Sequence, residues 1–551
     1  MERRYFLALL LAAAVVAITQ FLFPVAPPVP PPVDVKRDTV SSGVAPKAPV
    51  QESLPSATEQ PRAAATDSVS SVNIRPEITT VDTKRSTYQF SSIGAAPTLI
   101  RLKDYKNLTS SGGVVELQAP GEPLLKYGLV HQGDTVSLDR VPFRVTREGD
   151  PASGGALTYS ATVDNFNVTI RYGFVPDRYM VSINGRVDGP AENVYLLTQL
   201  PSTLRPTESD TTADLNSLAY SFKPQRDNAR LVQFGSLDPG EQELAAGPLT
   251  WAAVKNKYFV LGALNPPGST FDEVSLKGGP RTSKLATTAS ATIVKAIKDG
   301  NFTMDLYAGP QQQNELVAVG RDFDHVNPFG WRFLQGMVQP IATLCVRLLL
   351  WMHEVLQLSY GWVLVIFGVL IRILLWPLNQ SAMRSAMKMQ DIQPRLAEVQ
   401  KKYKDKPERQ REEIMKVYKE ANASPFTALT GCLPALIPMP VLFALFFVFQ
   451  GTIEFRGVPF MWLHDISMKD PYYILPVLMG VSMYVLSWIG LRNAPPNPQA
   501  KMMSYMFPVM MTFVLANMAS GLNLYYTAQN LAALPQQWLL ARERARRKRL
   551  T

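Results

Sequence analysis

Cysteine and histidine are scarce in this chain of 551 residues, and their positions exclude several kinds of site. The two cysteines, Cys345 and Cys432, lie in apolar surroundings, so they do not form a disulfide-stapled scaffold and offer none of the paired spacings of a zinc site. The four histidines are scattered between positions 131 and 464. The phosphate-binding pattern G-x-x-x-x-G-K-[ST] is also missing, so nothing suggests that this chain hydrolyses ATP.

Charged side chains are missing from long apolar stretches, each of about the 20 residues that a helix needs to cross a bilayer. We expect six such spans, and five of them contain no Asp, Glu, Lys, Arg or His once the flanking Glu2, Arg3 and Arg4 of the first are set aside. The first could be a signal peptide that is removed. Its apolar run of 19 residues, however, is not followed by the small-x-small pattern of a signal-peptide cleavage site, so we interpret it as an uncleaved anchor. The six spans are residues 1–23, 358–378, 426–450, 471–491, 502–519 and 521–540.

The surplus of positive charge marks one side of the membrane. Residues 24–339 hold 30 basic and 32 acidic groups, so the rest of the chain carries 25 basic against 13 acidic. Lys and Arg in short flanking segments favour the cytoplasmic side, and the segment 379–425, the loop 492–501 and the basic tail 541–551 fall on one side together. The sequence therefore predicts a polytopic α-helical membrane protein with both termini in the cytoplasm and residues 24–339 exported.

The exported part divides into a linker and an all-β domain. Residues 24–72 include ten prolines and almost no large apolar side chains, which predicts a disordered linker. From about residue 73 to 335, apolar residues alternate with polar ones, as in 166–174, and a Pro-Asp turn leads into 179–183, which indicates a hairpin. We expect one large antiparallel β-sandwich, as a binding or structural domain or, if acidic residues converge in it, a membrane-anchored glycan enzyme.

The segment 379–425 shows helical spacing of apolar residues on both sides of a turn with Pro407, so we expect a cytoplasmic helical hairpin. Its 11 basic and 7 acidic residues suit a docking surface for ribosomes, targeting factors or anionic lipid headgroups, and the alternative is a solvated connector. The basic tail could add to ribosome contact. The basic residues that we expect to dock are Arg384, Lys388, Lys401, Lys402, Arg542, Arg544, Arg546 and Arg547.

Arg372 is the one charged residue inside an apolar span. An arginine at a helix centre costs about 2.5–3.5 kcal/mol on insertion scales. Its side chain could reach the cytoplasmic headgroups, since it lies about 9 Å from the end of the span. The alternative is a wet cavity open to the cytoplasm, in which Arg372 and the polar residues of the last span meet an anionic or polar guest. These polar residues are Asn523, Thr527, Gln529 and Asn530.

The missing intramembrane carboxylates disfavour proton- or sodium-coupled carriers, which generally need such an acid or paired broken helices. The fifth span is rich in methionine, whose flexible side chain adapts to dissimilar apolar partners, and prolines recur along the spans. Both features suit a surface that handles varied apolar segments, and ordinary lipid-facing packing is the alternative.

Several motifs together resemble the YidC-type membrane protein insertases (YidC/Oxa/Alb family) of Gram-negative bacteria, over essentially the whole chain. They are Ile371-Arg372 with Trp376-Pro377-Leu378, Ser385 to Met389 with Gln393-Pro394, Gly431 to Pro434 and on to Met439-Pro440, Asp470 to Pro476, and Ser520-Gly521 to Tyr525-Tyr526.

This resemblance implies a chaperone and insertase without catalytic chemistry or cofactor, in the bacterial inner membrane, with its large domain in the periplasm. Its partners would be nascent membrane proteins, the Sec translocon and its accessory subunits, the ribosome, the signal recognition particle and its receptor, and anionic phospholipids. Arg372 and Tyr525 would line a hydrophilic groove, open to cytoplasm and lipid, that receives the polar or acidic flank of a substrate. The resemblance further implies an apolar slide at Met439, Pro440, Pro508 and Met511.

The same resemblance makes 341–357 an amphipathic helix at the periplasmic surface and the exported domain a β-supersandwich. Pro438 and Gly368 depart from it, since neither offers a polar side chain to the groove. The competing function from another class is a small-molecule or lipid transporter with an exported sensor domain. It would need an intramembrane acid or repeat symmetry, and the sequence has neither.

Overall fold

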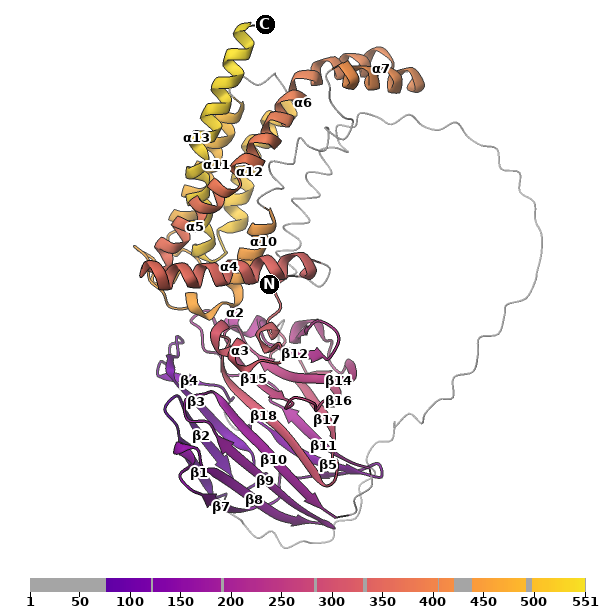
Figure 1. Cartoon of the computed structure of the whole chain (residues 1–551), viewed down its shortest axis with the longest axis vertical. Helices are drawn as coiled ribbons and strands as arrows, with labels where there is room; N and C mark the ends of the chain where they lie inside the picture. Colours follow the sequence, from indigo (N-terminus) through magenta and orange to yellow (C-terminus); the bar gives the residue numbers. More distant parts are fainter. Residues whose placement is uncertain are drawn as a thin grey trace, which may run out of the picture. The chain divides into compact units, whose positions relative to one another are not determined.

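The computed structural model describes residues 76–119, 122–189, 193–281, 285–330, 334–404, 406–420, 439–491 and 498–550 (Figure 1). The expected anchor 1–23, the linker 24–72, Cys432 and Pro438 lie outside these ranges.

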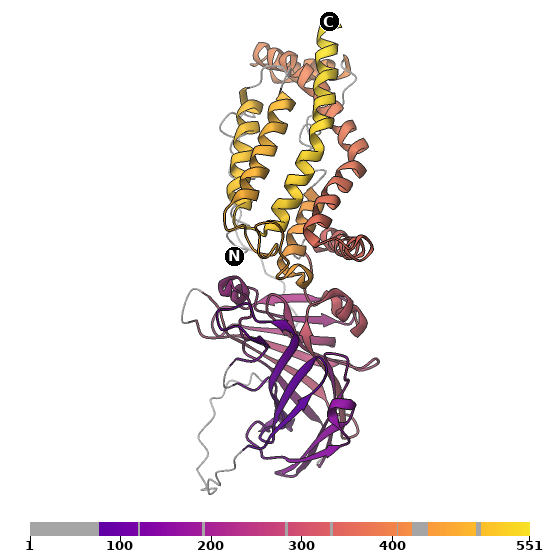
Figure 2. The same cartoon turned by 90° about the vertical axis from the view of Figure 1, so that its left-hand side faces the viewer.

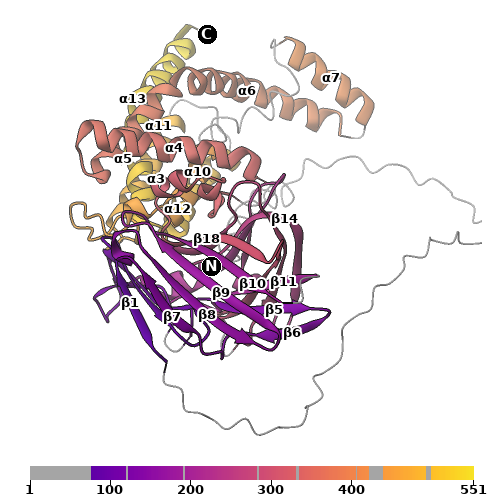
Figure 3. The same cartoon turned by 60° about the horizontal axis from the view of Figure 1, so that its bottom comes forward.

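Residues 78–310 form two antiparallel β-sheets. The first has four strands in the order β1-β2-β3-β4, and the second has 14, along the path β6-β5-β11-β17-β16-β14-β15-β18-β10-β9-β8-β7 with β12 on β14 and β13 on β12. Figure 3 shows β7 to β10 side by side, with β18 beyond β10. The strands are β1 (Ile78–Asp82), β2 (Ser86–Ser91), β3 (Pro97–Lys106), β4 (Val114–Glu116), β5 (Lys126–His131), β6 (Asp134–Ser137), β7 (Arg144–Glu148), β8 (Ala156–Val163), β9 (Phe166–Phe174), β10 (Met180–Asp188), β11 (Val194–Leu200), β12 (Ala219–Pro224), β13 (Arg230–Gln233), β14 (Gln242–Lys255), β15 (Phe259–Leu264), β16 (Phe271–Gly278), β17 (Ala289–Ala296) and β18 (Asn301–Pro310).

The hairpin expected from the alternating pattern is confirmed. In β9, Phe166, Val168 and Ile170 are buried while Asn167 and Arg171 face solvent, and β10 pairs with it so that Val181 lies opposite Phe174. Burying every second side chain fixes the register, because a shift by one residue would turn the apolar face to water.

Tyrosines fill much of the β core. Tyr127 and Tyr172 are fully buried with their hydroxyls 3.0 Å apart, and the Tyr172 hydroxyl donates to the Ala95 carbonyl at 2.6 Å. Burial raises the pKa of Tyr127 and of Tyr172, since an ionised phenol would be costly there. These hydroxyls therefore stay neutral, and the bond from Tyr172 ties the 14-stranded sheet to the loop between β2 and β3 of the other sheet.

Helices make up most of the C-terminal part (Figure 2). α11 packs on α12 and on α13, and α13 packs on α5. The helices are α2 (Thr211–Asn216), α3 (Gln313–Val319), α4 (Gln335–Leu356), α5 (Tyr360–Leu374), α6 (Trp376–Lys402), α7 (Pro407–Glu420), α10 (Met439–Gly451), α11 (Ile474–Leu491), α12 (Pro498–Leu515) and α13 (Ser520–Leu550), with 3-10 turns η1 (Pro151–Ser153), η2 (Phe234–Ser236), η3 (Phe323–His325) and η4 (Ile453–Phe455).

The helix that carries Arg372 is shorter than the expected span 358–378. α5 ends at Leu374, and α6 begins at Trp376 with Pro377 in its first turn. Proline has no amide hydrogen and its ring clashes with the carbonyl four residues earlier, so it ends one helix and suits the start of the next. The 15 residues of α5 rise about 22 Å, less than the roughly 30 Å of a typical hydrocarbon core.

Within the described residues, α11 is the one single helix whose length and apolar composition suffice to cross a membrane. α4 and α5 reach that standard only as a pair, and they are bent by 118° where they meet. α10 and residues 504–515 are shorter apolar helices. The count of six spans is therefore not established by these helices.

α4 begins six residues before the expected range 341–357. Its first turn includes the fully buried Val338, and Pro340 lies inside the helix. Its exposed side includes Leu344 and Trp351, seven residues apart, so α4 presents an apolar stripe.

The two helices expected in 379–425 are present. α6 and α7 pack through Ile392, Leu396 and Tyr418, and α7 starts at Pro407, the residue that predicted the turn. α13 continues without a break through the basic tail to Leu550.

Two of the sequence motifs have local structural reasons. Asp470 is fully buried and accepts the backbone N–H groups of Tyr472 and Leu475, so it fixes the start of α11. A Cβ atom at Gly521 would lie 2.4 Å from the ring of Phe449, so only glycine allows α13 to begin this close to α10.

Candidate functional site

Arg372 lies in the last turn of α5 and is buried among helices. Its Nη2 donates to Oε1 of Gln536 on α13 at 2.8 Å, and Gln536 in turn donates through Nε2 to the Trp376 carbonyl at 3.2 Å. No carboxylate pairs with this guanidinium in the part of the chain that the structure describes. The partner of the buried arginine is thus a neutral amide.

One face of α13 is turned toward α5. Tyr525, Gln529 and Gln536 follow one another at spacings of four and seven residues, which places them on one helix face, and all three are buried. The ring of Tyr525 packs on Phe367 of α5, with centroids 5.8 Å apart. Of the residues expected around Arg372, Tyr525 and Gln529 therefore belong to the helix face that meets its helix.

The other expected residues bond elsewhere. The Nδ2 group of Asn523 donates to the Leu515 carbonyl at the end of α12, and that of Asn530 donates to the Ser482 hydroxyl on α11 at 3.0 Å. Thr527 bonds within its own helix to the Asn523 carbonyl. Asn523 and Asn530 thus connect α13 to α12 and α11, Thr527 bonds inside α13, and none of the three hydrogen bonds involves the guanidinium.

Sequence reasoning missed Gln536, which is the direct partner of Arg372. Its position seven residues after Gln529 could have revealed it, because that spacing returns to the same helix face.

Polar atoms of Arg372 and of the α13 face toward α5 are buried and have no hydrogen-bond partner among the described residues. They are Nε of Arg372, the Tyr525 hydroxyl and Nε2 of Gln529. Buried polar groups normally find a partner, and an unmet one costs about 1–3 kcal/mol. The site can therefore accept a polar guest or water that supplies acceptors to Arg372 and Gln529.

Gly368 serves close helix packing. A Cβ atom there would lie 3.0 Å from the Tyr525 carbonyl and 3.3 Å from the Cβ of Ala528. The close approach of α5 to α13 thus explains why a glycine stands at position 368. A larger side chain there would lie between the two helices.

The residues expected to form the apolar slide lie on α10 and α12. Met439, Pro440 and Met511 are half-buried, with both methionines against the helical core, and Pro508 is buried within α12. A separate stripe on α12 is exposed instead. It consists of Met502, Met506, Val509 and Phe513.

The basic residues expected to dock lie on α6 and α13. Lys401 and Lys402 are exposed at the end of α6, and on α13 Arg546 is exposed while Arg542 stacks 3.6 Å above the Trp538 ring. The side chains of Arg384, Lys388, Arg544 and Arg547 are outside the description. Among described residues, no group of three or more His, Cys, Asp or Glu side chains is arranged to hold a metal ion.

Comparison with known proteins places this architecture in a family. Residues 78–344 match the family described as the YidC periplasmic domain, and residues 351–548 match the family described as 60Kd inner membrane protein. The membrane protein insertase YidC of Chlorobaculum tepidum is 32% identical over 409 residues, covering 69% of this chain and 67% of the relative. That of Syntrophus aciditrophicus is 29% identical over 560 residues, covering 98% and 100%.

A crystal structure of an active YidC insertase with its first transmembrane domain resolved is similar at 17% identity and a TM-score of 0.33, covering 84% of this chain and 93% of the other. The chain belongs to the YidC family of membrane protein insertases, as its motifs predicted.

Proposed function

We propose that this chain inserts transmembrane segments of nascent proteins into the bacterial inner membrane, alone or beside the Sec translocon, and that Arg372 receives the polar or acidic flank of the inserting segment. The observation that supports this most is that the buried Arg372 bonds to a neutral partner, the amide of Gln536. The Nε atom of Arg372 also has no hydrogen-bond partner among the described residues.

The chemistry of such a site favours an incoming acid. Hydrogen bonds between a guanidinium and a carboxylate are roughly twice as strong as those to neutral acceptors. A carboxylate on a substrate can therefore displace or join the Gln536 amide, and it does not have to break an existing ion pair. The same contact shelters a polar flank that would otherwise meet hydrocarbon.

We also propose a locally thinned bilayer at the site, which the shortness of α5 supports. The exposed α12 stripe from Met502 to Phe513 would offer the apolar part of the substrate a neighbouring surface.

We further propose six spans with both termini in the cytoplasm and the β domain in the periplasm, on the distribution of basic residues. The α6–α7 hairpin and the basic end of α13 would then face the ribosome, the signal recognition particle and its receptor, and anionic phospholipids.

The test is complementation in a host depleted of its own insertase, with Arg372 as wild type, Lys or Ala. Insertion of single-span substrates with an acidic or a neutral exported tail is followed by protease protection. We expect wild type and R372K to insert both substrates and R372A to lose mainly the acidic one.

The matched control is R347A, which removes an exposed arginine from α4 and should leave insertion unchanged. Equal insertion of both substrates by R372A, at normal protein levels, would show that Arg372 does not receive the flank. Failure of the wild-type chain itself, when correctly folded in the membrane, would contradict the insertase function.

A further inference from the structure

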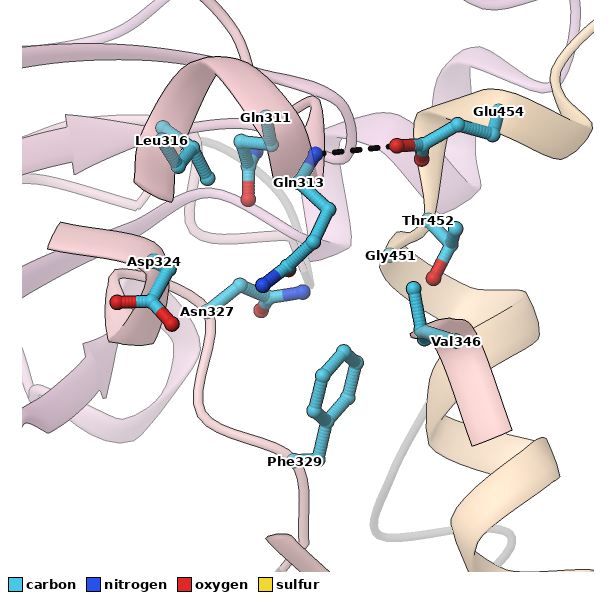
Figure 4. Close-up of a pocket in the computed structure, with 10 residues that line it drawn as sticks. All are labelled: Gln311, Gln313, Leu316, Asp324, Asn327, Phe329, Val346, Gly451, Thr452 and Glu454. Atoms are coloured by element: carbon cyan, nitrogen blue, oxygen red, sulfur yellow. Dashed lines mark hydrogen bonds between the residues drawn. The ribbon is translucent and has the colours of Figure 1, made fainter. Parts of the chain in front are cut away.

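The segment between α10 and α11, residues 452–473, is held firmly where it leaves α10. Ile453 belongs to the hydrophobic core of the β domain. Next to it, Oε1 of Glu454 accepts the backbone N–H of Gln313 at 3.0 Å, the bond drawn in Figure 4. The beginning of this segment is therefore fixed to the β domain.

The other end of the segment is held by one buried carboxylate. Asp470 accepts the indole N–H of Trp462 through Oδ1 at 3.3 Å, in addition to the backbone N–H groups at the start of α11. Phe460 and Leu463 exchange backbone hydrogen bonds of 2.9 and 2.8 Å, so residues 460–463 form a tight turn. The bond from Trp462 thus ties this turn to the start of α11.

The turn also packs on the first residues of α5. A Cβ atom at Gly361 would overlap the ring of Phe460, so only glycine allows this contact. The rings of Trp362 and Phe460 meet edge to face, with centroids 5.4 Å apart. The position of the turn is therefore coupled to the start of α5, the end of that helix far from Arg372.

Four large side chains on the turn and on the two helix starts that it contacts face outward. Met461, Tyr472 and Tyr473 are 67%, 66% and 45% exposed, and Trp362 is 48% exposed. Met461 and Tyr473 have left-handed backbone conformations, with φ of +52° and +57°, which bulky residues rarely adopt. Such a conformation persists only where the surrounding structure imposes it, and here it belongs to residues whose side chains remain outside the core.

The surroundings that suit these four side chains are the headgroup layer of a bilayer. None of the four is charged, and tyrosine and tryptophan combine an apolar ring with a polar end, which favours the level of the lipid headgroups. Tyr472 and Tyr473 directly precede α11, the one single helix in the described part of the chain whose length and apolar composition suffice to cross a membrane. They stand where such a helix leaves the hydrocarbon.

We propose that Trp362, Met461, Tyr472 and Tyr473 lie in the headgroup layer on the side of the β domain and anchor the start of α5 at that depth. This inference rests on the proposed function and deepens it, because the 15 residues of α5 are shorter than the hydrocarbon core. When the start of such a helix is anchored at one surface, the missing length falls at the other. Arg372 is then held below the cytoplasmic headgroups, and the bilayer must thin to meet it.

The first test measures depth in the bilayer by spin labelling of the full-length chain in vesicles of phosphatidylethanolamine and phosphatidylglycerol, with C345S and C432S as background. A nitroxide on M461C is compared with one on L244C, because Leu244 on β14 is apolar and similarly exposed, at 63%. Oxygen is enriched in the bilayer, and a polar nickel complex is enriched in water. We expect oxygen to relax the label at 461 more than nickel does, and the reverse at 244.

Equal access of the nickel complex to the labels at 461 and 244 would overturn the proposal. Protection of the label at 461 from both reagents would also overturn it, and would identify a second copy of the chain as the occupant of this surface. Because no substrate is present, a failure of this test is distinguishable from a failure of the insertase function.

The second test measures whether these residues hold α5 at its depth. A label on L374C, at the exposed end of α5, is compared in chains with Met461 and with M461D. We expect M461D to move this label toward the cytoplasmic surface by about 3 Å, the rise of two helical residues, because Arg372 is drawn to the headgroups.

The matched control is M415D, which changes an exposed methionine on α7 and should leave the depth of the label at 374 unchanged. An unchanged depth in correctly folded M461D, or an equal shift in M415D, would overturn the anchoring of α5. If M461D does not fold, the depth of the label at 461 still decides whether this surface meets lipid.

Discussion

At the scale of single residues, Arg372 is hydrogen-bonded to the side-chain amide of Gln536, which lies 164 positions later in the chain. Gln536 both accepts from Arg372 and donates to the Trp376 carbonyl, so it connects the guanidinium to the break between α5 and α6. An amide at this point leaves the positive charge of the arginine unneutralised. The proposed reception of acidic flanks depends on that free charge.

Replacing Gln536 by glutamate tests this dependence. In Q536E a carboxylate would pair with Arg372 and compete with the substrate, so we expect insertion of acidic tails to fall about tenfold, while neutral tails are less affected. The measurement is protease protection of matched acidic and neutral substrates. Q536A is the control, because it removes the amide and adds no charge, and a loss of insertion for Q536A as large as for Q536E would contradict the competition.

At the scale of elements, the geometry of the site depends on how closely α5 approaches α13. Gly368 provides this approach, since the Tyr525 carbonyl and the Ala528 methyl group lie where its side chain would be. The same contact holds Tyr525 against Phe367.

We expect G368A to lower the stability of the helical region by about 1–3 kcal/mol through overpacking, although alanine favours a helix by about 1 kcal/mol over glycine. Thermal unfolding in detergent measures this. The control is G336A on α4, where a Cβ atom would meet nothing within 4 Å, and its Tm should be unchanged or slightly higher. If G368A and G336A change Tm equally, α5 and α13 can move apart enough to accommodate the added methyl group, and the overpacking argument is wrong.

At the scale of the whole molecule, the loop after α10 connects the helical region to the β domain. Arg456 donates through Nε to both Glu208 oxygens at 2.8 and 3.0 Å and through Nη2 to the Lys106 carbonyl at 2.8 Å. Both side chains of the ion pair are less than 10% exposed. Burial raises the pKa of Glu208 even beside this arginine.

Removing the arginine should therefore be costly and depend on pH. We expect R456A to destabilise the junction by about 3–5 kcal/mol at neutral pH, because it leaves a buried carboxylate without a partner. A raised carboxyl pKa gives stability that is fully present below the ordinary value of 4.5 and is lost as pH rises through the folded-state pKa. The Tm deficit of R456A should accordingly be larger at pH 8 than at pH 5.

The control is R186A, which breaks an exposed pair with Asp188 and should change Tm little at either pH. A deficit of R456A that does not vary between the two pH values would mean that Glu208 is not the group left uncompensated.

The sequence by itself determined the local structure and the family. Alternation along 166–174 placed a strand, Pro407 placed the start of α7, and the motifs around Arg372 and Asp470 identified the insertase family, because each of these signals is carried by residues close together in the chain.

Tertiary structure decided which side chains meet. The polar residues of α13 look alike in sequence, yet Gln529 and Gln536 face α5 while Asn523 and Asn530 bond to α12 and α11. The insertion of Ile453 into the hydrophobic core of the β domain was likewise not predicted. The contact between Arg372 and Gln536 joins residues 164 positions apart. All of these contacts depend on how helices rotate and approach one another, which local patterns of hydrophobicity leave open.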